Sequence, residues 1–121
     1  MANDLSTLMA SLREAREGSR ELDRDIYEFA IKGRTERVKR DVIAGPYTTD
    51  LTAAVALLER VLPGSEFGLD VGYHNEERIC SAYVGDAKPR DDNDYWSFTS
   101  RGATPALALC LAVLIAKEKA P

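Results

Sequence analysis

The segment of this chain best suited to hold an anion comprises Arg101, Gly102, Ala103 and Thr104. It precedes Pro105 and an uncharged run, 106–116, a pattern that predicts a buried helix beginning near Thr104. Free N–H groups and partial positive charge at a helix start attract anions, and an arginine adds paired donors for phosphate or carboxylate. The alternative is a capped core helix with an incidental surface arginine.

Aromatic and amide side chains upstream of this segment are suited to bind a nucleotide. Tyr83 and Trp96 offer rings on which a base can stack, and Asn93 offers a donor and an acceptor that match the edge of adenine. Residues 101–104 would then bind the phosphate of that nucleotide. Plainer interpretations exist, because Asn93 suits a turn, and because Trp96 and Phe98 alternate with Tyr95 and so can form the core face of their strand.

Groups suited to catalysis or metal binding are few. His74 is the only histidine and falls in an expected hairpin turn, and no cysteine pair has zinc-ligand spacing. Neither a nucleophile elbow nor a phosphate-binding glycine loop is present. The aspartates near the polar loop 85–94 lack the spacing of a calcium-binding loop; they are Asp86, Asp91, Asp92 and Asp94. The sequence therefore predicts a binding protein, without catalytic residues, metal or cofactor.

The length and net charge of the chain limit the kinds of partner that it can bind. The chain has 121 residues and a net charge of −4, which suits a single domain over 1–121 and disfavours a nucleic-acid polymer as partner. Charge is locally reversed in 32–41, which is either the lip of an anion site or a solvated segment. Cys80 and Cys110 lie in apolar segments, as reduced core cysteines of a cytoplasmic protein do. The run 106–116 is shorter than the roughly 20 residues of a membrane span.

The elements that must position these residues follow from hydrophobic periodicity. Spacings of three and four residues predict helices over 4–16, 20–31, 50–62 and 104–118. Alternation predicts strands over 67–73, 79–84 and 95–99. Short turns between strands imply antiparallel pairing. We therefore expect an α+β fold, a small three-stranded antiparallel sheet packed with about four helices in a layered α/β/α arrangement, with Tyr83 on a partly open face.

Three short motifs occur in a fixed order: Gly18–Asp23, Pro46–Ala54 and Ala103–Cys110. Together they resemble small proteins of the phage α/β/α sandwich domain family, which includes or adjoins the phage anti-Thoeris sponges. The family's sponges sequester cyclic ADP-ribose signals made by bacterial TIR-domain enzymes, and some also sequester cyclic oligonucleotides made by CBASS synthases. The basic segment 32–41 departs from the shorter connection expected in that family.

The resemblance implies a homo-oligomer in the host bacterial cytoplasm that holds its ligand between subunits without cleaving it. It also implies contacts from an aromatic on the sheet, an asparagine and an arginine near the last helix, which match Tyr83, Asn93 and Arg101. Sequestration of a cyclic nucleotide is thus the first functional hypothesis. The second is a phage structural or regulatory interaction module that has no small ligand and uses its aromatic face to associate. A nucleotide-degrading enzyme is weaker, because it would depend on His74 or the aspartates.

Overall fold

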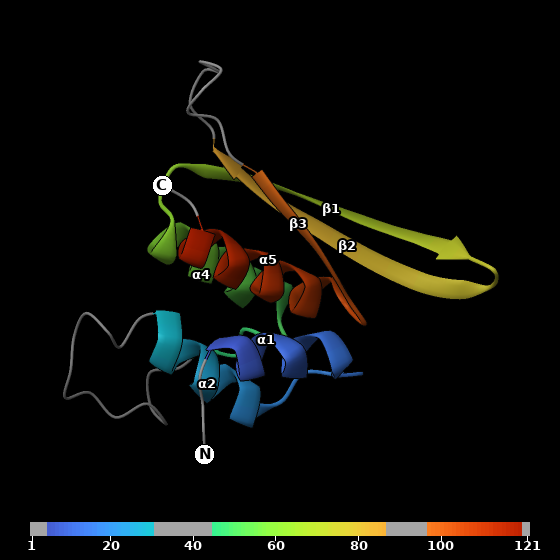
Figure 1. Ribbon diagram of the computed structural model, residues 1–121, viewed down its shortest axis with the longest axis horizontal. Coiled ribbons are helices and arrows are strands. Elements are labelled where there is room, and N and C mark those ends of the chain that lie inside the picture. The colour runs from blue at the N-terminus through green and yellow to red at the C-terminus, as the bar shows by residue number, and fades with distance from the viewer. Residues whose placement is uncertain (1–4, 31–44, 87–96, 120–121) are drawn as a thin grey trace.

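The structure, a computed structural model, describes residues 5–30, 45–86 and 97–119, and it confirms the expected α+β class. In this part of the chain, three strands form one antiparallel sheet in the order β1-β2-β3, and four helices pack with it (Figure 1). The elements are α1 (Leu5–Glu14), α2 (Arg20–Ala30), α4 (Leu51–Val61), β1 (Ser65–His74), β2 (Glu77–Asp86), β3 (Ser97–Gly102) and α5 (Pro105–Lys119).

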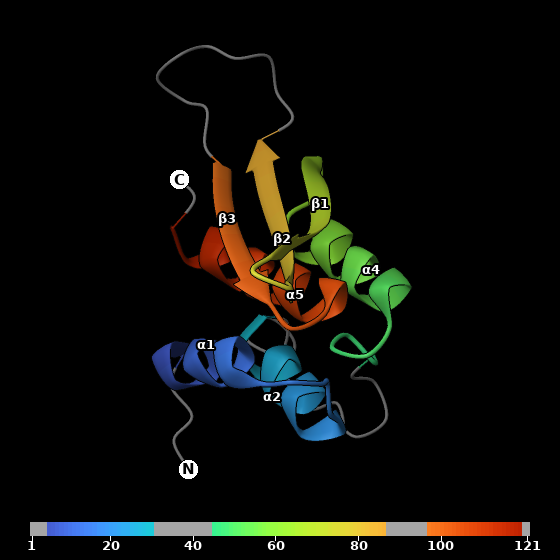
Figure 2. The same ribbon diagram turned by 90° about the vertical axis from the view of Figure 1, so that its right-hand side faces the viewer.

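Helix α5 lies at the centre of the described fold. Every residue from Ala106 to Leu114 is buried, because the helix packs against the sheet on one side and against α4 and α1 on others. A helix that is apolar all round needs such neighbours. All four described helices consequently lie on one side of the sheet (Figures 1 and 2). The layers run sheet, then α5 with α4, then α1 with α2, whereas an α/β/α sandwich has helices on both faces.

Strands β1 and β2 form a long hairpin that extends past the helices (Figure 1). Asn75 and Glu76 turn the chain with φ of 53° and 68°, the left-handed values that a two-residue hairpin turn of the primed type requires. The pairing begins at His74 and Glu77, so both strands are longer than the sequence pattern predicts. Alternation along β2 is confirmed, since Cys80, Ala82 and Val84 are buried against the helices.

Strand β3 differs from the expected third strand at its far end. Residues 100–102 extend the strand, whereas the sequence grouped them with the opening of the last helix. The reason is the close approach of α5: the Ser100 hydroxyl donates to the Ala108 carbonyl at 2.7 Å, and a Cβ on Gly102 would stand 2.7 Å from the Ala108 nitrogen. Ser100 and Gly102 are not large apolar residues, so this part of the sequence lacks the alternating pattern that predicts a strand.

The helix caps are partly as expected. The Leu107 N–H donates to the Thr104 hydroxyl at 3.2 Å, which confirms Thr104 as the cap of α5. Helix α4 is capped by Asp50, whose carboxylate accepts from the Thr52 N–H at 2.9 Å. Thr48 is buried and bonds elsewhere.

Candidate functional site

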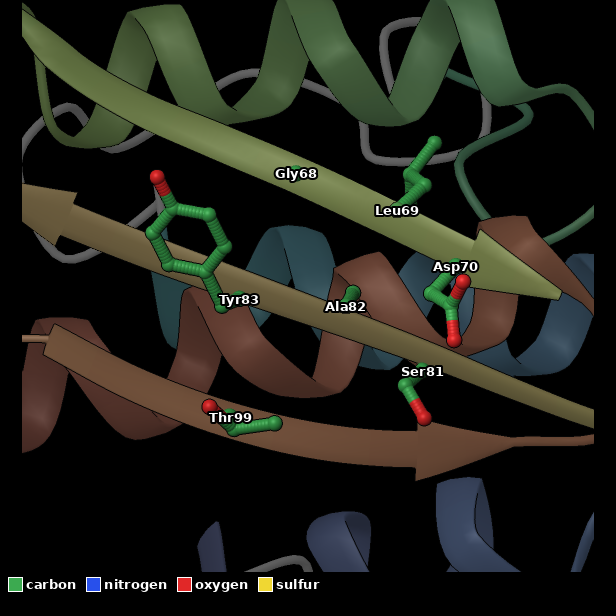
Figure 3. A pocket seen from close by; sticks show the side chains of 7 residues that line it. All are labelled: Gly68, Leu69, Asp70, Ser81, Ala82, Tyr83 and Thr99. Carbon is green, nitrogen blue, oxygen red and sulfur yellow. The ribbon is translucent and has the colours of Figure 1, made fainter.

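A shallow hollow of about 320 Å³ lies on the sheet face opposite the helices (Figure 3). Its lining includes Gly68 and Asp70 of β1, Ser81 and Tyr83 of β2, and Thr99 of β3. The register places Gly68, Tyr83 and Thr99 in one row across the sheet, and Asp70 and Ser81 in the next. Because paired residues share a face, all five lie on the open side. The expected position of Tyr83 is therefore confirmed.

The ring of Tyr83 is held over the neighbouring strand. A Cβ at Gly68 would stand 2.7 Å from its Cε1 atom, so the ring occupies space that only a glycine leaves open. The phenolic hydroxyl donates to the Glu66 carboxylate at 3.0 Å. Figure 3 shows the ring crossing from β2 toward β1 with one face toward the open side. This arrangement provides a positioned aromatic platform of the kind on which a base stacks.

Arg101 lies on the same open face, at the edge of the hollow. Its partner in the register, Ser81, lines the hollow, and the arginine is exposed. The next residue, Gly102, faces α5, so strand alternation turns Arg101 the opposite way. The structure thus brings Arg101 together with Tyr83 and separates it from the start of α5, with which the sequence grouped it.

A second hollow, of about 310 Å³, lies where the starts of α2, α4 and α5 meet. Gly18, Thr48 and Thr104 are in its lining, and Glu17 adds a carboxylate. Free N–H groups at helix starts favour anions, but the Thr104 hydroxyl is already used as a cap, and the described residues that line this hollow include no cation and no aromatic ring. The open face, which offers a cation and a ring, is therefore the stronger candidate for a nucleotide.

The remaining sequence-predicted residues fall in different places. Gly102 packs against α5, and Ala103 is exposed with its carbonyl 3.7 Å from the Cys80 sulfur. Neither lines the two hollows. Asn93 and Trp96 lie outside the described residues. Of the segment 101–104, only Arg101 belongs to the open face.

Five residues of the open face were not predicted from the sequence as site residues. They are Glu66, Gly68, Asp70, Ser81 and Thr99. The only signal for them is strand alternation, which puts the polar members of 67–73 opposite its apolar ones. Alternation assigns faces within one strand but not the pairing between strands, so the contact of Tyr83 with Gly68 could not be predicted.

The three motifs behind the family resemblance meet in the core. Asp23 is fully buried, and its Oδ1 accepts from the Thr48 N–H at 2.8 Å and lies 2.7 Å from the Thr48 hydroxyl. That hydroxyl also accepts from the Ser19 N–H at 2.9 Å. The Cys110 thiol donates to the Tyr47 carbonyl at 3.2 Å. These bonds join α2, the turn before α4, and α5, so the motifs have a structural role here.

Stability is expected to fall above pH 9 because of Cys110. Burial, and to a lesser extent the Asp23 carboxylate, raises the pKa of this thiol above its ordinary value of 9.0. The unfolded chain releases the thiol proton as pH rises through that value, whereas the folded chain keeps it, so unfolding becomes more favourable. The loss approaches about 1.4 kcal/mol per pH unit. Urea unfolding on both sides of pH 9 measures it; Cys110→Ser, which keeps a donor for Tyr47 without titrating there, should remove most of this slope.

The described residues contain neither a membrane-spanning helix nor a cluster of metal-binding side chains. No helix among them is long and apolar enough to cross a membrane. Within the same ranges, no three histidine, cysteine, aspartate or glutamate side chains gather as metal ligands. Comparison of the chain with protein families, with curated proteins and with solved structures gave no match. The link to phage sandwich proteins accordingly stays a resemblance of three short motifs.

Proposed function

We propose that this chain binds and sequesters cyclic nucleotide signals, such as cyclic ADP-ribose isomers and cyclic oligonucleotides, without cleaving them. The supporting observation is the open sheet face, where the Tyr83 ring and the Arg101 guanidinium lie within two rows of the register. A ring stacks on a base, and a guanidinium pairs with phosphate through two parallel hydrogen bonds. Such a site gives affinity without a catalytic group.

The proposal includes a homo-oligomer that acts in the host bacterial cytoplasm, where such signals are made. An open sheet face gives a ligand only one protein wall, and a second subunit would supply the other and exclude water. Strand β1 also offers a surface for association, on the sheet face opposite the hollow, since Phe67, Val71 and Tyr73 expose 38%, 45% and 74% of their surface. Exposed apolar residues gathered on one strand are typical of a protein interface.

Calorimetric titration tests the proposal directly. Cyclic ADP-ribose isomers and cyclic trinucleotides are titrated into the purified protein, and at least one is expected to bind. Arg101→Ala is expected to weaken that binding about tenfold, because charge-assisted bonds to phosphate are lost at a partly solvated site. The matched control is Arg78→Ala, which removes the same charge from an exposed position on the opposite face of β2.

Two outcomes of this titration would count against sequestration. If no member of the panel gives heat, the chain is not a sponge for these signals. If binding is detected but the ligand recovered after heating the complex is altered, the protein is an enzyme. Unmodified ligand, with Arg101→Ala weakened and Arg78→Ala unchanged, supports the proposal.

The alternative is a phage structural or regulatory interaction module with no small ligand. The exposed apolar residues of β1 favour it, because they suit self-association without a nucleotide. Sedimentation of Arg101→Ala separates the two functions. An oligomer that stays intact while nucleotide binding is lost excludes the pure interaction module.

A further inference from the structure

Asp70 places a carboxylate in a site that we propose for an anionic ligand. It lies on the open face in the same row as Ser81 and Arg101, and Figure 3 shows its carboxylate directed toward Ser81. Two strand spacings, about 10 Å, separate its backbone from that of Arg101. Among the described residues, neither side chain has an ion-pair partner. A ligand that displaces water from this exposed carboxylate binds well only if it offers a donor in place of that water.

The arrangement of the three groups orients a nucleotide. A base over the Tyr83 ring and a phosphate at Arg101 require the sugar to cross the sheet above Ser81, between Asp70 and Arg101. Asp70 repels the phosphate, so the phosphate is directed to the β3 side of the hollow. The groups of the sugar that can face a carboxylate favourably are its hydroxyls, and a carboxylate is a recurrent acceptor for the ribose 2′-hydroxyl.

We infer, building on the proposed function, that Asp70 accepts hydrogen bonds from ribose hydroxyls and selects ribonucleotides over their 2′-deoxy counterparts. A ligand with the hydroxyl satisfies the carboxylate. A deoxy ligand leaves that carboxylate facing an apolar carbon while it displaces water, which lowers affinity. The site thereby distinguishes a ribose signal from deoxynucleotides, a distinction that Tyr83 and Arg101 alone do not make.

The experiment uses two probe pairs, cyclic ADP-ribose and cyclic tri-adenylate, each with its 2′-deoxyadenosine analogue. The unchanged protein is expected to bind at least one ribose form about tenfold more tightly than the deoxy form. In Asp70→Asn the ratio falls to about twofold, because the neutral amide oxygen accepts a weaker bond from the 2′-hydroxyl than a carboxylate does. Glu77→Gln is the control, since it removes the same charge at the far end of β2, and it should leave the ratio unchanged.

The results separate this inference from the function on which it rests. If neither ribose probe binds the unchanged protein, the proposed function and the role of Asp70 both fail. If a ribose probe and its deoxy analogue bind equally, or if Asp70→Asn keeps the original ratio, sequestration stands and the role of Asp70 is wrong. Thermal unfolding of Asp70→Asn, an exposed position, should match that of the unchanged protein.

Discussion

Replacing Asp23 by alanine is expected to lower the free energy of unfolding by about 3 kcal/mol. The carboxylate has no exposed surface, and its two oxygens contact the backbone N–H and hydroxyl of Thr48 and the guanidinium of Arg20. Alanine leaves the Thr48 N–H buried without an acceptor. Since the same residue joins α2 to the turn before α4, the loss affects two elements at once. Urea unfolding measures it.

Three further variants show whether the loss comes from this network. Glu21→Ala removes an equal charge from an exposed position in the same helical turn and should change stability by less than about 0.5 kcal/mol. Thr48→Val keeps the backbone bond to Asp23 but removes the hydroxyl, which should cost about 1.5 kcal/mol. The Asp23→Ala and Thr48→Val double variant should lose less than the sum. A loss below about 1 kcal/mol in Asp23→Ala contradicts the structural role.

Local pattern was sufficient to predict most helices and strands of this fold. The apolar run 106–116 predicted the most buried helix, and alternation predicted the face of Tyr83. The meeting of Asp23 with Thr48 could not be predicted, because the two residues are 25 positions apart and no local rule links them. That all four described helices lie on one side of the sheet could not be predicted either, because periodicity shows that a face is apolar without showing which element covers it.

The candidate site was predicted in its chemistry and not in its geometry. Arg101 was grouped with Thr104 because they are close in sequence. The strand extends through Gly102, however, and alternation turns the arginine to the other face. Asp70 could not be predicted as a site residue, because its place in the site depends on strand register. Asp70 pairs with Ser81, and Ser81 pairs with Arg101, so the three residues form one row across the sheet. Pairing is a long-range property that one sequence does not encode visibly.

Nucleotide binding is expected to weaken about 30-fold when Tyr83 is replaced by alanine. Stacking of a base on an aromatic side chain contributes roughly 1–3 kcal/mol, and this ring is already positioned by its bond to Glu66 and its seat over Gly68. Tyr83 is half-buried on the face away from the core, so the folded structure should persist. Calorimetric titration with cyclic ADP-ribose and cyclic tri-adenylate measures the affinity, and thermal unfolding checks the fold.

The position of the ring, rather than its presence alone, is tested by Gly68→Ala. The added Cβ would stand 2.7 Å from Cε1, at the far end of a side chain that can rotate away, so the ring leaves its seat at little cost to stability. Affinity should fall about tenfold with Tyr83 intact. Gly72→Ala is the matched control, because it adds the same methyl on the same face of β1 where nothing lies within 4 Å. If both variants bind equally well, the ring over Gly68 is not the platform for the base. If only Gly68→Ala binds more weakly, the Gly68→Ala and Tyr83→Ala double variant should bind no worse than Tyr83→Ala alone. That result would show that the two residues act as one unit.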